Sequence, residues 1–336
     1  MGFVNDCHTI IRRSNKDIFR FRTSNVLTYD YFDTYSNLIK STYITDKPLD
    51  FTKFCFNLDN NDNIYGIYID DSLKLVDIKN SETTFTNFDV FTYNSNKFTL
   101  LFPYIKKLDN EIHILYYVYS NDSGNICALI HHHKLNGVWT ENKIDFINNT
   151  ILNNFTVIWI QNSPTVFYLN LVNGFEEVFM SKFNLSTSTW SKPSQLTNTR
   201  KNKIYLSVLK DSLNFCHIVF CENVDNGYAV KYINGYLMDN KLDINISKYI
   251  TGSSSCMYPS IMKFKSDIYI MWVNYNRLHT SISNDLGKTW SDHKIDEFSL
   301  EEEFTRSLFY SNYKYDLDYN TTSVFTTFDD IGILGF

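Results

Sequence analysis

Proline and glycine are scarce in this chain, whose 336 residues include 5 prolines and 11 glycines. Disordered segments are commonly rich in these residues and poor in aromatics, whereas this chain has 27 Phe and 24 Tyr. Aromatic side chains are favoured on the pleated surface of strands. The composition therefore excludes a disordered chain and favours a strand-rich fold that buries a sizeable core.

The sequence also lacks the signals of export and of membrane insertion. Residues 1–6 show neither the basic segment nor the apolar run of a signal peptide, and no stretch offers the roughly 18 apolar residues of a membrane span. We therefore expect no membrane span, and a protein that is cytoplasmic or exported by a route that the sequence does not show. The net charge of −6 argues against a nucleic-acid partner.

No Cys-x-x-Cys pair occurs among the 6 cysteines, and their density is too low for a disulfide scaffold. Reduced thiols buried in a cytosolic fold are the simpler interpretation. No phosphate-binding glycine loop, Gly-x-Ser-x-Gly elbow or Cys–His nucleophile spacing occurs either, so no cofactor is expected. The cysteines are Cys7, Cys55, Cys127, Cys216, Cys221 and Cys256.

What the sequence does contain is a repeat of about 50 residues. Trp139 and Trp190 lie one step apart and Trp290 two steps further on, with the intervening copy lacking its Trp near Leu242. Short apolar strands recur at the same step, and several follow another apolar stretch across a polar hairpin turn. Seven copies of a four-strand unit of this length are typical of β-propeller blades. The recurring strands begin at Ile18, Ile64, Ile112, Val166, Cys216, Ile268 and Val324.

The chain ends favour closure of such a ring of blades. After the seventh copy only residues 331–336 remain for a further strand, whereas a spare apolar segment, Gly2-Phe3-Val4, precedes the first copy. We expect that this N-terminal strand pairs with the last blade, which removes two exposed sheet edges. The sequence thus predicts one all-β domain over residues 1–336, a seven-bladed β-propeller, with six blades as the alternative.

The most specific motif runs from Ser283 to Trp290 and reads Ser-x-Asp-x-Gly-x-Thr-Trp. Asp285 can accept hydrogen bonds from backbone N–H groups across a tight turn, and Gly287 can take a positive φ. Thr289 is expected to re-enter a strand, and Trp290 to insert its ring between neighbouring sheets. The octapeptide resembles the Asp-box, or BNR repeat, of sialidase-like β-propellers, where it lies away from the ligand face.

In propellers with this strand order, the loops between the second and third strands of each blade open onto the ligand-binding face. Such loops converge and can vary without cost to the core. Polar residues assigned to that face are therefore candidates for ligand binding, although each one alone is more often ordinary turn chemistry. The candidates are Arg22, Arg200, Arg277, Asp70, Asp71, Glu222, Asp225, Asp329 and Asp330, with Glu176 and Glu177 in the same set of loops.

Arginine is scarce, yet several arginines crowd the first repeat. Arg20 and Arg22 share one face of a strand by the two-residue alternation, which would suit an anion-binding pocket. We favour the alternative that a local Asp or Glu neutralises the pair.

The resemblance raises the question of sialidase catalysis. That reaction needs three convergent arginines, a Tyr–Glu nucleophile pair and an Asp acid/base. The segment Ile11-Arg12-Arg13-Ser14 lacks the proline of the family's first arginine motif, and no other candidate lies in a recognisable motif. A glycosidase with two carboxylates about 5 to 9.5 Å apart is also open. In the sialidase set, the other two arginines would be Arg200 and either Arg277 or Arg306, and the tyrosine would be Tyr310 or Tyr313.

The run His131-His132-His133 suggests a metal site at first sight. In a strand, however, only His131 and His133 share a face, and no third ligand is spaced nearby in the sequence. Residues 59–63 resemble the start of a calcium loop but lack its glycine and its later glutamate. We therefore expect no metal.

The scaffold signal is strong and every catalytic set is incomplete, and a propeller hosts enzymes and binding modules alike. We predict a non-enzymatic recognition module that binds a glycan or a protein on the loop face, with exposed aromatics such as Tyr228, Tyr275 or Tyr313 as platforms. A glycoside hydrolase is the alternative, and a structural assembly subunit is a second alternative. The oligomeric state stays open.

Overall fold

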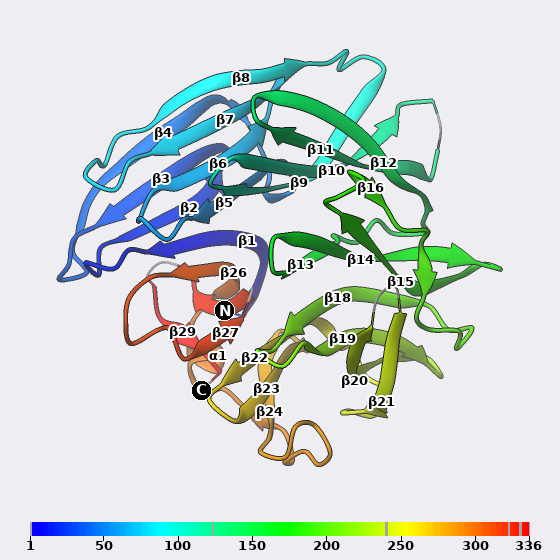
Figure 1. Cartoon of the computed structure of the whole chain (residues 1–336). Coiled ribbons are helices and arrows are strands. Elements are labelled where there is room, and N and C mark those ends of the chain that lie inside the picture. Colours follow the sequence, from blue (N-terminus) through cyan, green and yellow to red (C-terminus); the bar gives the residue numbers. More distant parts are fainter. Residues whose placement is uncertain (1, 123, 239–240, 322, 329–330, 336) are drawn as a thin grey trace. The chain divides into compact units, whose positions relative to one another are not determined.

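Strands make up nearly all of the regular structure in the computed structural model (Figure 1), which describes residues 2–122, 124–238, 241–321, 323–328 and 331–335. Within these ranges the helical elements are a single 3-10 turn, η1 (Phe51–Lys53), and one short helix, α1 (Phe298–Glu301). The prediction of an all-β fold is confirmed. In the described part of the chain, no helix is long and apolar enough to cross a membrane.

The chain divides into two compact units. The N-terminal unit comprises residues 6–146 and 307–317, and the C-terminal unit comprises residues 1–5, 147–306 and 318–336.

Sheets of four antiparallel strands, joined in chain order by hairpins, build most of the N-terminal unit. This is the four-strand repeat that the sequence predicts. The first group of four, which is part of a larger sheet, contains β1 (Phe3–Arg12), β2 (Ile18–Ser24), β3 (Val26–Phe32) and β4 (Leu38–Pro48). The second contains β5 (Phe54–Leu58), β6 (Ile64–Ile69), β7 (Ser72–Ile78) and β8 (Thr86–Thr92). The third contains β9 (Phe98–Leu108), β10 (Glu111–Ser120), β11 (Ile126–Leu135) and β12 (Val138–Asn148).

The C-terminal unit repeats this pattern with shorter outer strands. One sheet contains β13 (Thr156–Ile160), β14 (Ser163–Val172), β15 (Phe175–Asn184), β16 (Thr189–Trp190) and β17 (Ser194–Gln195). The next contains β18 (Lys203–Lys210), β19 (Phe215–Val224), β20 (Gly227–Met238) and β21 (Lys241–Tyr249). A further sheet contains β22 (Met257–Phe264), β23 (Asp267–Asn274), β24 (Arg277–Ser283), β25 (Lys294–Ile295) and β27 (Tyr319–Thr321). The remaining strands are β26 (Phe304–Ser311), β28 (Ser323–Thr327) and β29 (Ile333–Leu334).

The N-terminal strand pairs with a late strand, as predicted from the chain ends. β1 lies between β26 and β2 in the sheet order β29-β28-β26-β1-β2-β3-β4. The Phe304 N–H donates to the Gly2 carbonyl at 3.2 Å, and the Asn312 N–H to the Arg12 carbonyl at 3.0 Å. Because the first and seventh copies share one sheet, the described residues form six hydrogen-bonded sheets. The number of blades stays a prediction.

Side chains between adjacent sheets form the core. All six residues of β6 are buried, since this inner strand is covered on both faces. The rings of Phe21 on β2 and Phe56 on β5 stack at 3.7 Å between centroids, and both side chains are fully buried. Burying one such side chain contributes about 1.5–3 kcal/mol, so ring pairs of this kind stabilise the packing between sheets.

The turn after β24 has most of the features that the octapeptide predicts. The Thr289 N–H and hydroxyl donate to the Asp285 carboxylate at 2.8 and 2.6 Å, and these bonds lower the pKa of Asp285 to about 2. Gly287 has φ +85°, and the Trp290 ring lies 5.0 Å from the ring of Tyr232 on the neighbouring sheet. Thr289 does not re-enter a strand, because its N–H is bonded to Asp285 instead of a ladder partner.

Replacing Gly287 by alanine is expected to lower the free energy of unfolding by about 1–3 kcal/mol. A Cβ at this position would lie 2.3 Å from the Tyr232 hydroxyl, and the backbone is left-handed. Tyr232 cannot move aside easily, because it is fully buried and bonded to His217 Nδ1 at 2.7 Å. Urea unfolding measures the effect, and Gly252→Ala is the control because a Cβ there meets nothing within 4 Å. Equal stability of the two variants would contradict this account of the turn.

Candidate functional site

Two of the predicted arginines form the neutralised pair that the sequence favours. Arg22 Nε and Arg20 NH2 lie 2.7 and 2.9 Å from the same Asp30 oxygen, and Ser41 donates to the other oxygen at 2.6 Å. Asp30 is fully buried. Although burial opposes it, the hydrogen bonds from Arg22, Ser41 and Arg20 lower the pKa of Asp30. The carboxylate therefore stays charged and holds both cations.

Among the described residues, most of the other loop-face candidates make local contacts and form no hydrogen bond or ion pair with one another. Asp225 is exposed in the turn after β19 with φ +52°. Asp329 and Asp330 lie outside the described residues. Asp70 pairs with Lys74 at 3.0 Å, and Asp71 pairs with Lys47. The Arg277 guanidinium donates to the carbonyls of Ser299 and Leu300 at 2.7 and 3.1 Å.

Two candidates, Glu222 and Arg200, belong to one hydrogen-bonded network. At its centre is a buried lysine, Lys203, that sequence reasoning missed. Lys203 begins β18 and is 0% exposed. Its Nζ lies 2.7 Å from Glu177 Oε2 and 3.4 Å from Glu222 Oε2, and both carboxylates are also buried. Glu177 stands near the start of β15 and Glu222 near the end of β19, so antiparallel pairing brings them to one end of their sheets. An ammonium between two carboxylates offsets the cost of burying them.

Arg200 lies at the exposed edge of this network. Its backbone N–H donates to Glu177 Oε1 at 2.9 Å, and its φ of +55° is uncommon for a residue with a side chain. Within the described residues, its guanidinium has no hydrogen-bond or ion-pair partner. The buried network thus fixes the backbone of an arginine whose charge is available to an anion.

A tyrosine completes the cluster. The Tyr249 hydroxyl, at the end of β21, donates to Glu222 Oε1, although Tyr249 is 40% exposed and Glu222 is fully buried. Lys231 Nζ donates to the same carboxylate oxygen at 3.0 Å, and Lys201 Nζ lies 3.3 Å from the phenol oxygen. Lys231 Nζ also lies 4.6 Å from the centroid of the Tyr249 ring. We refer to Tyr249 and Glu222 as the Tyr–Glu pair.

The protonation states of the Tyr–Glu pair follow from its surroundings. Although burial opposes it, hydrogen bonds from Thr199, Tyr249 and Lys231 lower the pKa of Glu222, so its carboxylate is ionised at neutral pH. Burial raises the pKa of Tyr249, and the hydrogen bond to the charge of Glu222 raises it further, so the phenol keeps its proton. A protonated oxygen next to a charged acceptor is the resting state of a nucleophile paired with its base.

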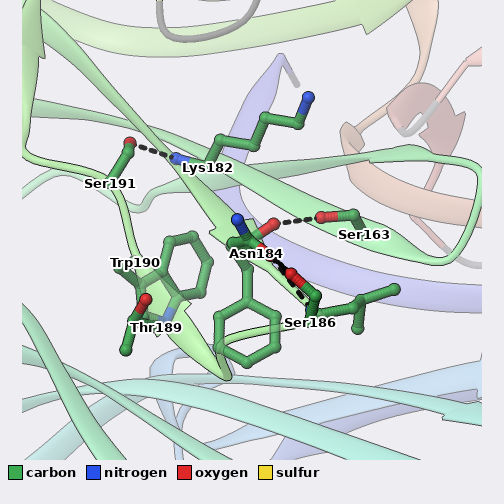
Figure 2. Close-up of a pocket in the computed structure, with 9 residues that line it drawn as sticks. Ser163, Lys182, Asn184, Ser186, Thr189, Trp190 and Ser191 are labelled. Atoms are coloured by element: carbon green, nitrogen blue, oxygen red, sulfur yellow. Dashed lines mark hydrogen bonds between the residues drawn. The ribbon is translucent and has the colours of Figure 1, made fainter.

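A pocket of 530 Å³ lies elsewhere in the C-terminal unit, beside the turn between β15 and β16 (Figure 2). Trp190, Asn184 and Lys182 line it together with several hydroxyl groups. An aromatic ring among polar groups suits a sugar, but no carboxylate, histidine or tyrosine lines the pocket. The Tyr–Glu pair, by contrast, has groups that can transfer a proton.

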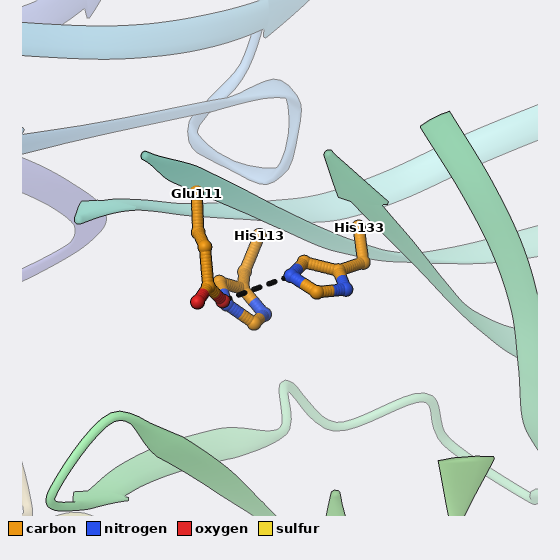
Figure 3. A group of neighbouring side chains, drawn as sticks. All are labelled: Glu111, His113 and His133. Atoms are coloured by element: carbon orange, nitrogen blue, oxygen red, sulfur yellow. Dashed lines mark hydrogen bonds and ion pairs between the residues drawn. The ribbon is translucent and has the colours of Figure 1, made fainter. Parts of the chain in front are cut away.

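A histidine cluster in the N-terminal unit is the second site that sequence reasoning missed. His113 on β10 pairs directly with His133 on β11, and Glu111 Oε2 lies 3.1 and 2.9 Å from their Nε2 atoms (Figure 3). His131 Nε2 lies 3.0 Å from His113 Nδ1. Burial lowers the pKa of His113 to about 4, with a smaller contribution from His133. His131 and His133 share a face as expected, but the further ligands come from the neighbouring strand.

Comparisons with solved structures identify the fold. A PL25 ulvan lyase, bound to -[GlcA(1-4)Rha3S]-, matches with a TM-score of 0.62 at 11% identity over 100% of this chain and 96% of that one. The GH93 α-L-arabinofuranosidase of Fusarium graminearum, in complex with arabinobiose, matches with 0.53 at 11% identity over 82% and 92%. The α-L-arabinanase of Penicillium chrysogenum matches with 0.56 at 8% identity over 76% and 84%. The chain therefore has a β-propeller fold.

Sequence comparisons add nothing to this result. No family model matches the chain, and no curated protein matches it in sequence.

The prediction of a non-enzymatic recognition module is wrong on this comparison. The structures just named are glycoside hydrolases and a polysaccharide lyase, and a second lyase, Uly1, matches with a TM-score of 0.55. They favour the alternative of a glycan-processing enzyme over a protein-binding module. Sequence motifs could not bring Tyr249 and Glu222 together, because these residues meet only through strand pairing in the fold.

Proposed function

We propose that this chain is a glycoside hydrolase that acts on sugars carrying a negative charge. The Tyr–Glu pair is the observation that carries the proposal, because it joins an exposed phenol to a buried, ionised carboxylate. A Tyr–Glu nucleophile pair is also what the resemblance of the octapeptide to sialidase-like propellers implies. Tyr249 and Glu222 are the residues that we assign to it.

In the proposed reaction, the Tyr249 oxygen attacks the anomeric carbon while its proton passes to Glu222. The bond from that carbon to the departing oxygen breaks, and the departing oxygen takes a proton. Water then attacks the anomeric carbon and gives a proton to the group that had protonated the departing oxygen, while the bond to Tyr249 breaks and Glu222 returns its proton to the phenol oxygen. Lys201, 3.3 Å from the phenol oxygen, stabilises the negative charge that develops there.

We propose that Asp225 donates the proton to the departing oxygen. Asp225 is exposed and lies in a turn, three residues after Glu222. Arg22, Arg277, Asp70 and Asp71 receive no catalytic role in this proposal, because each is engaged by a local partner.

The charge around the Tyr–Glu pair supports an anionic substrate. Arg200 is exposed with no partner for its guanidinium among the described residues, and Lys201 and Lys231 flank the phenol ring. Arginine binds carboxylates in a bidentate manner. The matched ulvan lyase holds a fragment that contains GlcA, a sugar acid, which is consistent with this assignment.

Two finer structural assignments belong to the same proposal. We infer that residues 283–290 are an Asp-box of the sialidase-like type, on the basis of the Asp285 and Gly287 geometry. We also propose that residues 1–336 form one propeller domain with seven blades, six being the alternative, because the ulvan lyase aligns with 100% of the chain.

Incubation of the purified protein with a panel of acidic and neutral oligosaccharides tests the reaction class. We expect fragments of the acidic sugars whose mass shows the addition of one water per broken bond. Fragments with a new carbon–carbon double bond would show elimination and would overturn the hydrolase assignment. An unchanged panel would contradict glycan cleavage altogether.

A further inference from the structure

The side chains of Glu111, His113 and His133 converge at one end of the β10–β11 hairpin. In the register of these strands, Glu111 stands opposite Leu135 and His113 opposite His133. Each of the three residues offers one ligand atom, and these atoms all lie within 4.8 Å of one another. We propose that they form a binding site for one Zn²⁺ ion, independently of the proposed hydrolase reaction.

The donor set is one that zinc uses. Two imidazole nitrogens and one carboxylate oxygen are the protein ligands of a well-known class of zinc sites, in which water takes the fourth tetrahedral position. Hard cations such as Mg²⁺ and Ca²⁺ are instead bound mostly by oxygen ligands. His113 is fully buried and His133 2% exposed, whereas Glu111 is half-buried at the hairpin end. The ion can therefore enter past Glu111.

The distances are close to those of a tetrahedral site. With zinc–ligand bonds near 2.0–2.2 Å, neighbouring ligand atoms are about 3.3 Å apart. The carboxylate oxygen of Glu111 lies 3.1 and 2.9 Å from the two Nε2 atoms. A shift of a few tenths of an ångström, within reach of side-chain rotation alone, therefore opens the cluster to the ion. The two imidazole rings stack at 4.4 Å between centroids, and both Nε2 atoms face the Glu111 carboxylate.

His131 supplies the outer partner that such sites commonly have. Its Nε2 lies 3.0 Å from His113 Nδ1, on the far side of the ring from the proposed ligand atom. When His113 Nε2 binds the ion, its Nδ1 carries the proton and donates it to His131 Nε2. Hydrogen bonds of this kind orient a ligating histidine and strengthen binding. His131 is thus a positioning residue and not a ligand.

The bound ion would link the two neighbouring strands at the end of their ladder of backbone hydrogen bonds. Glu111 and His113 come from β10 and His133 from β11, so the ion would bridge the hairpin in addition to its backbone hydrogen bonds. Zinc that binds only the folded state stabilises it by an amount that rises with the logarithm of the zinc concentration once the site is saturated. Thermal unfolding therefore gives a second readout that does not depend on any enzymatic activity.

The test is zinc titration of chelator-treated, dialysed full-length protein by calorimetry, with Co²⁺ absorption as a probe of four-coordinate geometry. We expect one ion per chain, a dissociation constant below about 1 μM, and a higher midpoint of thermal unfolding when zinc is added. Glu111→Gln and His133→Gln should lose this binding, and His131→Ala should weaken it about 10–100-fold.

His132→Gln is the matched control, because His132 lies on the same strand but bonds to Tyr116 and Glu141 instead of the cluster. It should bind zinc like the wild type. Glu111→Gln keeps the test meaningful if His133→Gln fails to fold, since position 111 is only half-buried. The absence of stoichiometric binding to the wild type would overturn the proposal, as would a Glu111→Gln variant that binds as tightly as His132→Gln.

Discussion

Replacing Tyr249 by phenylalanine is expected to lower the rate of glycan cleavage by about 10²–10⁴-fold. The variant keeps the aromatic ring but removes the oxygen that we assign as the nucleophile. It also leaves Glu222 without one hydrogen bond, although Lys231 and Thr199 still bond to that carboxylate. Initial rates on an acidic oligosaccharide, measured with equal amounts of folded protein, give the comparison.

Tyr236→Phe is the matched control for this measurement. Tyr236 lies on β20 of the same sheet, is 53% exposed, and packs its ring on Phe215 at 4.6 Å, a contact that phenylalanine retains. It should cleave at the rate of the wild type. If Tyr249→Phe also kept full activity, the Tyr–Glu pair would not be the catalytic site.

The second large effect is on stability. Replacing Lys203 by methionine is expected to lower the free energy of unfolding by about 3–5 kcal/mol, because it removes the cation paired with the buried carboxylate of Glu177, whereas Glu222 keeps its ion pair with Lys231. Glu177 and Glu222 are 1% and 0% exposed and share the Lys203 ammonium. Chemical denaturation at neutral pH measures the change.

Combining Lys203→Met with Glu177→Gln and Glu222→Gln should recover much of that loss, since neutral amides are cheaper to bury than unpaired carboxylates. Lys201→Met serves as the surface control, because Lys201 is only half-buried, its Nζ lies 3.3 Å from the Tyr249 hydroxyl, and it has no carboxylate partner among the described residues. A Lys203→Met variant within about 0.5 kcal/mol of the wild type, the usual range for surface substitutions, would show that the ammonium does not compensate these carboxylates.

The scaffold could be predicted from the sequence because its signals are local or periodic. The apolar strands recur at the blade step, and β6 and β19 begin within one residue of the predicted Ile64 and Cys216. The octapeptide predicted the Asp285 hydrogen bonds and the positive φ of Gly287, both set by residues within one turn. Thr289 was the exception, because bonding to Asp285 removed its N–H from strand pairing.

The candidate site could not be predicted in the same way, because it depends on which strands meet and in what register. Glu222 was selected as a loop-face carboxylate, but Tyr249 is one of 24 tyrosines and is 27 residues away. Lys203 carries no motif, and only its burial between two carboxylates distinguishes it from the other lysines. Composition and spacing contain none of this information.

The histidine cluster shows the same limit at shorter range. A third ligand for His131-His132-His133 was sought along the same segment, whereas Glu111 and His113 lie on the preceding strand. The hairpin places His113 directly opposite His133. Shifting the pairing by one residue would have turned His113 to the other face of the sheet. Pairing the two predicted strands before searching for ligands would have found the site.

The most direct test of the central claim compares one acidic polysaccharide with the same polymer after chemical reduction of its carboxyl groups. The quantity to measure is the initial rate at which the wild-type protein releases new chain ends. We predict cleavage of the acidic polymer and a rate about 10–100-fold lower on the reduced one, since loss of a charge-assisted contact costs about 1.5–3 kcal/mol. Equal rates on the two polymers would contradict an anionic substrate, and cleavage of neither would contradict a glycan-cleaving enzyme.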